Sequence, residues 1–140
     1  MWSIVAWVVD PVALKGVPGA VRQLSVAAAV AILYAANNAA LSAHAVPDMF
    51  EPFASGHLND ILAPFGFLSL TNAIYAMMGH GVCRLGPTMA LAALASAVWE
   101  GLAPLVFPES VADPLDVVCY FVGAILYWMT VGPRSSARRI

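Results

Sequence analysis

The stretch Pro87–Pro133 reads PTMALAALASAVWEGLAPLVFPESVADPLDVVCYFVGAILYWMTVGP. It contains two long apolar runs separated by the short connection Glu109–Pro114. An apolar run of about 20 residues is long enough to cross the hydrocarbon core of a bilayer as a helix. Because the connection is short, the two helices are expected to be antiparallel neighbours. This stretch therefore predicts an all-α membrane protein.

Two further apolar runs precede this pair, which predicts an integral membrane bundle of four transmembrane helices. The composition agrees, because 61% of the residues are hydrophobic and only 10% are charged. Ordinary soluble domains carry roughly 25% charged residues. The predicted spans are about 23–43, 61–79, 87–107 and 115–132.

Charged residues are sorted by side in this arrangement. All six Lys and Arg residues fall in the N-terminal segment, the 80–86 loop or the C-terminal tail, which share one side. Of the eight acids, only Asp10 falls on that side. Since loops rich in Lys and Arg stay cytoplasmic, both termini are predicted in the cytoplasm and the acidic face outside. The predicted parts are an interfacial N-terminal segment (1–23), a transmembrane domain (24–133) and a basic cytoplasmic tail (134–140).

Acidic residues occur at the outer ends of the predicted helices. Glu100 lies within the third span, Asp60 begins the second, and Asp113 and Asp116 begin the fourth. A carboxylate in hydrocarbon is costly unless it is neutral, paired or hydrated, so such residues usually face the bundle interior. We therefore expect these acids to line one outward-facing polar pocket.

The spacing of nearby residues along the helices predicts further members of this pocket. His57 and Asp60 are three positions apart and share a helix face. Asp116, Tyr120 and Gly123 continue the stripe that begins at Asp113, and Gly123 would allow close helix packing. The pocket candidates are Glu100, Asp113, Asp116, Asp60, His57, Asn59, Asn38 and Tyr120.

The segment that follows Glu100 resembles the C-terminal signature of VanZ-like membrane proteins. In that signature, a Glu near the end of one span precedes the pattern D-x-x-D-x-x-x-N-x-x-G. This chain supplies Asp113, Asp116 and Gly123, with Tyr120 in place of the Asn. The family's Arg before the acids has no counterpart in this chain.

A second segment, GHLNDILA at residues 56–63, resembles a G-H-x-N-D-x-L-A element of some VanZ-like relatives. The family's Gln three residues after the Glu is Ala103 here. The resemblance implies a divergent VanZ-like protein of the bacterial cytoplasmic membrane with the four-span plan. It also implies a role at the cell envelope, where the family is linked to glycopeptide antibiotic resistance, but no established reaction.

Three functions fit these observations. The first is a membrane protein whose acidic pocket binds or carries a cation, a proton or an envelope-associated molecule. The second is a membrane enzyme that uses Glu100 and the Asp residues as acid and base or as ligands for a hard cation. The third is a structural membrane subunit whose acids cap helices and support packing.

Partners and cofactors are only partly indicated. The lipid bilayer is the predicted partner, together with a possible envelope-associated ligand. The basic residues are too few and scattered for nucleic acid. No cofactor fingerprint is evident, but a divalent cation is compatible with the acids, and its candidate ligands are Glu100, Asp60, Asp113 and Asp116.

Overall fold

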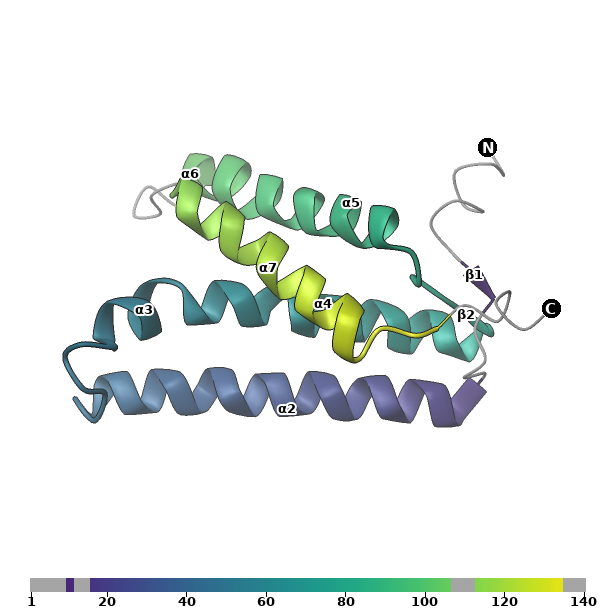
Figure 1. Cartoon of the computed structure of the whole chain (residues 1–140), viewed down its shortest axis with the longest axis horizontal. Helices are drawn as coiled ribbons and strands as arrows, with labels where there is room; N and C mark the ends of the chain where they lie inside the picture. The colour runs from purple at the N-terminus through teal and green to yellow at the C-terminus, as the bar shows by residue number, and fades with distance from the viewer. Residues whose placement is uncertain (1–9, 12–15, 107–112, 135–140) are drawn as a thin grey trace.

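The structure is a computed structural model, and it describes residues 10–11, 16–106 and 113–134. Within this part of the chain, long helical segments run alternately up and down, side by side (Figure 1). They are α2 (Gly16–Ser42), α4 (Leu58–Met77), a segment that begins with α5 (Leu85–Ser96), and α7 (Pro114–Thr130). The all-α prediction is confirmed.

The first helix begins earlier than expected. α2 starts at Gly16, so the end of the predicted interfacial segment 1–23 is helical and continuous with the first span. Pro18 lies in the first turn, where its missing N–H has no helical partner to lose. The remaining described part of that segment is β1 (Asp10–Pro11). The predictions for residues 1–9 and 12–15, for the end of the third span and the connection at 107–112, and for the tail at 135–140 lie outside the described residues.

The third helical segment is not the uniform helix predicted for 87–107. α5 is followed by the π-helical stretch η1 (Ala97–Leu102) and by α6 (Ala103–Val106). Pro104 has no N–H with which to bond the Glu100 carbonyl four residues earlier, which accounts for the departure from α geometry. Glu100 therefore lies in a π-helical stretch, a feature that recurs at functional sites.

Two short elements complete the described chain. β1 pairs antiparallel with β2 (His80–Gly81), so that Asp10 lies opposite Gly81. This pairing brings part of the N-terminal segment to the loop between α4 and α5. At the other end of the molecule, α3 (Glu51–Gly56) follows α2 and leads into α4 (Figure 1).

α4 is central, since it packs against both α2 and α7, while α5 packs against α7. Gly123 of α7 lies directly against α4: an added Cβ would overlap the Ile61 carbonyl oxygen and lie 2.8 Å from Pro64 Cγ. Close packing of α7 on α4 therefore depends on the missing side chain. Beside this contact the core is built from Leu68, Ala92, Ala124 and Tyr127.

A buried polar chain links three helices at the end opposite α3. The Tyr127 hydroxyl donates to Gln23 Oε1 over 3.0 Å and accepts from Asn72 Nδ2 over 2.9 Å. Asn72 Oδ1 in turn accepts from the Val82 N–H over 2.7 Å. Buried hydrogen bonds of this kind fix how the helices are aligned, because shifting one helix would leave several polar groups unpaired.

Two helical segments of the described chain are long and apolar enough to cross a membrane, namely α2 and the stretch Leu85–Leu102. α7 is a shorter apolar helix. α4 does not meet the same criterion, because its interior carries polar residues such as Asn72. Membrane association is thus supported by two helices, and the count of four spans is not established by length and composition.

Candidate cation site

The polar candidates gather at the end of the molecule that carries α3. The C-terminal part of α2, the first turn of α4, η1 and the start of α7 all reach this end (Figure 1). Among the described residues the basic side chains belong to the opposite end: Arg22 near the start of α2, Arg84 before α5, and Arg134 after α7. The acids at this end therefore lie in a region where the described part of the chain has no nearby Lys or Arg.

His57, Asp60 and Asp116 form the tightest group. His57 Nδ1 lies 3.1 Å from Asp116 Oδ1, across the α4–α7 contact. One ligand atom from each of the three residues lies within 4.8 Å of the others. A tetrahedral zinc ion bonded at about 2.1 Å holds its ligand atoms about 3.4 Å apart. The three side chains would therefore have to rotate toward one another to bind one ion.

The ionisation of the Asp60 carboxyl group is affected by its burial and by the neighbouring acids. Its pKa is raised, first by burial and then by the neighbouring Asp116, while His57 acts in the opposite direction. Asp60 lies in the first turn of α4, before the predicted span at 61–79. Two part-buried carboxylates that repel each other are stabilised by any cation bound between them.

Glu100 and Asp113 have a different arrangement from the one expected. Glu100 Oε2 accepts from the Asp113 backbone N–H over 3.0 Å. Asp113 is the N-cap of α7, and its Oδ1 accepts from the Leu115 N–H over 2.8 Å. The side chain of Asp113 is exposed and caps α7. Of the candidate cation ligands, Glu100 and Asp113 therefore lie outside the close group, whereas Asp60 and Asp116 lie in it. His57, which was not a candidate ligand, is the third member of the group.

Three Asn side chains join α2 to α4 beside this group. Asn37 Nδ2 donates to Asn59 Oδ1 over 3.1 Å and to the Ala54 carbonyl over 2.8 Å. Asn59 Nδ2 donates to Asn38 Oδ1 over 3.0 Å. The predicted candidates Asn38 and Asn59 therefore position the first turn of α4 against α2, and Asn37 is a buried member that the candidate set did not include.

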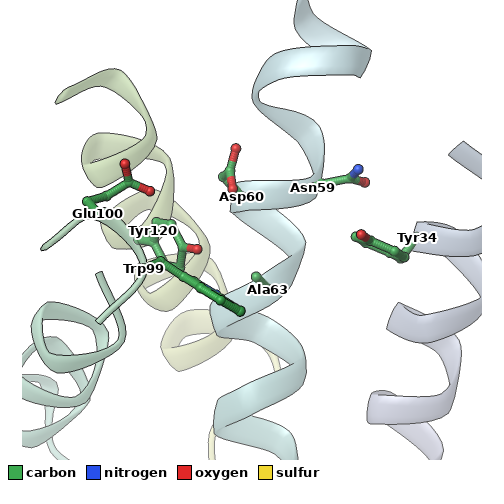
Figure 2. Close-up of a pocket in the computed structure, with 7 residues that line it drawn as sticks. All are labelled: Tyr34, Asn59, Asp60, Ala63, Trp99, Glu100 and Tyr120. Carbon is green, nitrogen blue, oxygen red and sulfur yellow. The ribbon is translucent and has the colours of Figure 1, made fainter. Parts of the chain in front are cut away.

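A pocket of about 450 Å³ opens next to Asp60. Small-molecule sites have volumes of roughly 300–1,000 Å³. We call it the aromatic–acidic pocket. Figure 2 shows side chains of α2 on one side of α4 and those of η1 and α7 on the other. Its lining residues are Tyr34, Asn59, Asp60, Ala63, Trp99, Glu100 and Tyr120.

Of the lining residues, Tyr34, Ala63 and Trp99 were not among the sequence candidates. Tyr34 lies three and four residues before Asn37 and Asn38, a spacing that places all three on neighbouring positions of one helix face. Trp99 directly precedes Glu100. The sequence thus contained a signal that Tyr34 belongs to the site. It contained no such signal for Trp99, because the π-helical stretch in which Trp99 lies has no sequence pattern that predicts it.

No family model, curated protein or solved structure matches the chain. The resemblance to VanZ-like proteins therefore stays a prediction, carried by residues 56–63 and by Glu100, Asp113, Asp116 and Gly123. What the site does has to be argued from its geometry and charge.

Proposed function

We propose that this chain is a four-span membrane protein that binds a divalent cation at its outer end through His57, Asp60 and Asp116. The observation that carries this proposal is the approach of one imidazole nitrogen and two carboxylates to within 4.8 Å of one another. Both termini are cytoplasmic in this proposal, and the membrane is the cytoplasmic membrane of a bacterium, as the VanZ-like resemblance implies.

Exposed apolar side chains support four spans. Large apolar residues are exposed on every long helical segment, for example Ile32 on α2, Ile74 on α4, Leu94 on α5 and Met129 on α7. Soluble monomers rarely expose large contiguous apolar surfaces. The core helix of a soluble protein is mostly buried, yet the most apolar windows of α2 and Leu85–Leu102 are only 0% and 22% buried.

The length and inner face of α4 fit the same arrangement. α4 (Leu58–Met77) contains most of the predicted span 61–79, and a helix of that span's length is roughly 29 Å long, close to the thickness of the hydrocarbon core. Two of the polar residues that lower its hydropathy, Ser69 and Asn72, are buried in the interior. Polar side chains inside membrane bundles typically face inward in this way.

The ligand set favours particular ions. Ca²⁺ and Mg²⁺ take oxygen ligands, whereas imidazole nitrogen suits Zn²⁺ and other transition metals. One imidazole with two carboxylates therefore favours Zn²⁺ or Mn²⁺. Three protein ligands also leave a coordination position for water or for a bound molecule.

Calorimetric titration of the chelator-treated protein in a maltoside detergent tests this proposal. We expect Zn²⁺ or Mn²⁺ to bind with one ion per chain, and Asp116→Asn or His57→Gln to weaken binding at least tenfold, since even groups that only orient ligands contribute about 10–100-fold. Asp113→Asn is the matched control, because it removes the same charge while Asn still caps a helix. Equal losses in Asp113→Asn and Asp116→Asn would contradict the assignment.

A purely structural role remains the second candidate, favoured by one observation. Glu100 and Asp113 are both engaged at the start of α7, where the first accepts the backbone N–H of the second. In that case no ion binds, and Asp116→Asn changes only the thermal stability. The same titration separates the two functions.

A further inference from the structure

A polar group reaches the aromatic–acidic pocket without a hydrogen-bond partner among the described residues. Tyr120 is only 3% exposed, and its hydroxyl makes no hydrogen bond within the part of the chain that the structure describes. Figure 2 shows this hydroxyl turned toward α4, among the residues that line the pocket. Because this hydroxyl is accessible from the pocket, it can donate or accept a hydrogen bond with a ligand bound there.

The charge of the lining indicates the sign of that ligand. Asp60 and Glu100 both line the pocket, and its lining includes no Lys or Arg from residues 16–106 or 113–134. One Glu100 oxygen is bonded to the start of α7, which leaves the other for a ligand. A carboxylate can only accept hydrogen bonds when ionised. A positively charged group is therefore favoured over an anion such as a phosphate.

The aromatic walls distinguish an organic cation from a metal ion. Tyr34 and Trp99 are 47% and 53% exposed although both line the pocket, so their rings are accessible. Figure 2 places them on opposite sides of α4, at the level of Ala63. Aromatic faces attract ammonium groups, with Trp the strongest, but they offer no ligand atom to a metal.

We propose that the aromatic–acidic pocket binds an organic ammonium group, with Glu100 as its charge partner, Tyr120 as a hydrogen-bonding group, and Trp99 and Tyr34 as aromatic walls. The ammonium group belongs either to a small free amine or to the headgroup of a membrane lipid. None of these four residues is a ligand in the proposed metal site. Ammonium binding is thus separable from metal binding, although Asp60 borders both.

The test compares choline with 3,3-dimethylbutan-1-ol, which has the same shape without the charge. Both are titrated by calorimetry into the chelator-treated protein in a maltoside detergent. We expect choline to bind and the neutral alcohol to bind at least tenfold more weakly, since the Glu100 carboxylate attracts only the charged compound. Equal binding of the two compounds, or no binding of choline, would overturn the proposal.

Single substitutions show which side chains of the pocket contact choline. We expect Glu100→Gln to weaken choline binding about tenfold or more, and Trp99→Leu to weaken it about three- to fivefold. Glu51→Gln is the matched control, because Glu51 is an exposed acid on α3 outside the pocket. Glu100→Gln should retain the wild-type affinity for Zn²⁺, which shows that the variant is folded. Wild-type choline affinity in Glu100→Gln would exclude the proposed charge partner.

Nanodiscs distinguish the two sources of the ammonium group. If a lipid headgroup occupies the pocket, discs of phosphatidylcholine should compete and lower the apparent choline affinity relative to discs of phosphatidylglycerol. If the ligand is a free amine, the choline affinity should be the same in both lipids. The binding that Glu100→Gln retains in each lipid is subtracted first, because it does not involve the proposed charge partner. Either result supports an ammonium site, whereas the loss of choline binding in both kinds of disc would refute it.

Discussion

Replacing Gly123 with Ala should loosen the contact between α7 and α4. The added Cβ would overlap the Ile61 carbonyl oxygen and approach Pro64 Cγ to 2.8 Å. Ile61 contributes a backbone atom that cannot rotate away, so the helices have to move apart. Overpacking of this kind costs about 1–3 kcal/mol, and the better helix propensity of Ala returns up to about 1 kcal/mol.

Because the overlap is with a backbone atom, the cost lies in the upper part of that range, about 2–3 kcal/mol. The net loss in the free energy of unfolding is then about 1–2 kcal/mol, which lowers Tm by about 5 °C in a domain of this size. The same movement separates Asp116 of α7 from His57 and Asp60 of α4, so the affinity for Zn²⁺ should fall as well. Thermal melting in detergent and calorimetric titration measure the two effects on one sample.

Gly101→Ala is the matched control, because a Cβ at that position meets no atom within 4 Å. It should melt at or slightly above the wild-type temperature. If Gly123→Ala also melted at or above that temperature, the close approach of α7 to α4 would not exist as described, and the reasoning would be refuted.

Three further outcomes are expected. Tyr127→Phe should lower the unfolding free energy by about 1–3 kcal/mol in chemical denaturation, because the two buried amides that it joins lose a partner; an unchanged value would contradict the chain of bonds. In chelator, Tm should fall as pH rises through the folded pKa of Asp60, because that pKa is raised above its unfolded value; Asp60→Asn should flatten this dependence, and an equally steep curve would argue against it. Reporter fusions after Gly79 and Pro133 should read as cytoplasmic and one near Gly56 as external, and an external signal after Pro133 would exclude the four-span topology.

The helical fold could be predicted because apolar runs separated by Pro, Gly and polar residues mark the helices directly. The end of the predicted first span, residue 43, lies within one residue of the end of α2 at Ser42. The start was missed, since Gly16 and Pro18 look like breakers but are tolerated in a first turn. The π-helical stretch was also missed, because Pro104 signals a disturbed helix without specifying its geometry.

The candidate site was foreseen in part. Spacing on single helices placed His57 with Asp60, and Asp116 with Tyr120 and Gly123, and the structure brings these two groups together across α4 and α7. Spacing could not decide which side chains point at one another between helices. For that reason the candidate ligands for a cation, if one binds, include Asp113, whose carboxylate accepts a hydrogen bond from the start of its own helix, and omit His57.

X-ray absorption spectroscopy of the Zn²⁺-loaded protein tests the cation site most directly. The spectrum should contain one imidazole nitrogen and oxygen ligands at about 2.0–2.2 Å, and His57→Gln should remove the imidazole contribution. His44→Gln, which changes a histidine outside the close group, should leave the spectrum as in wild type. An imidazole signal that survives in His57→Gln, or a wild-type spectrum without one, would contradict the site at His57, Asp60 and Asp116.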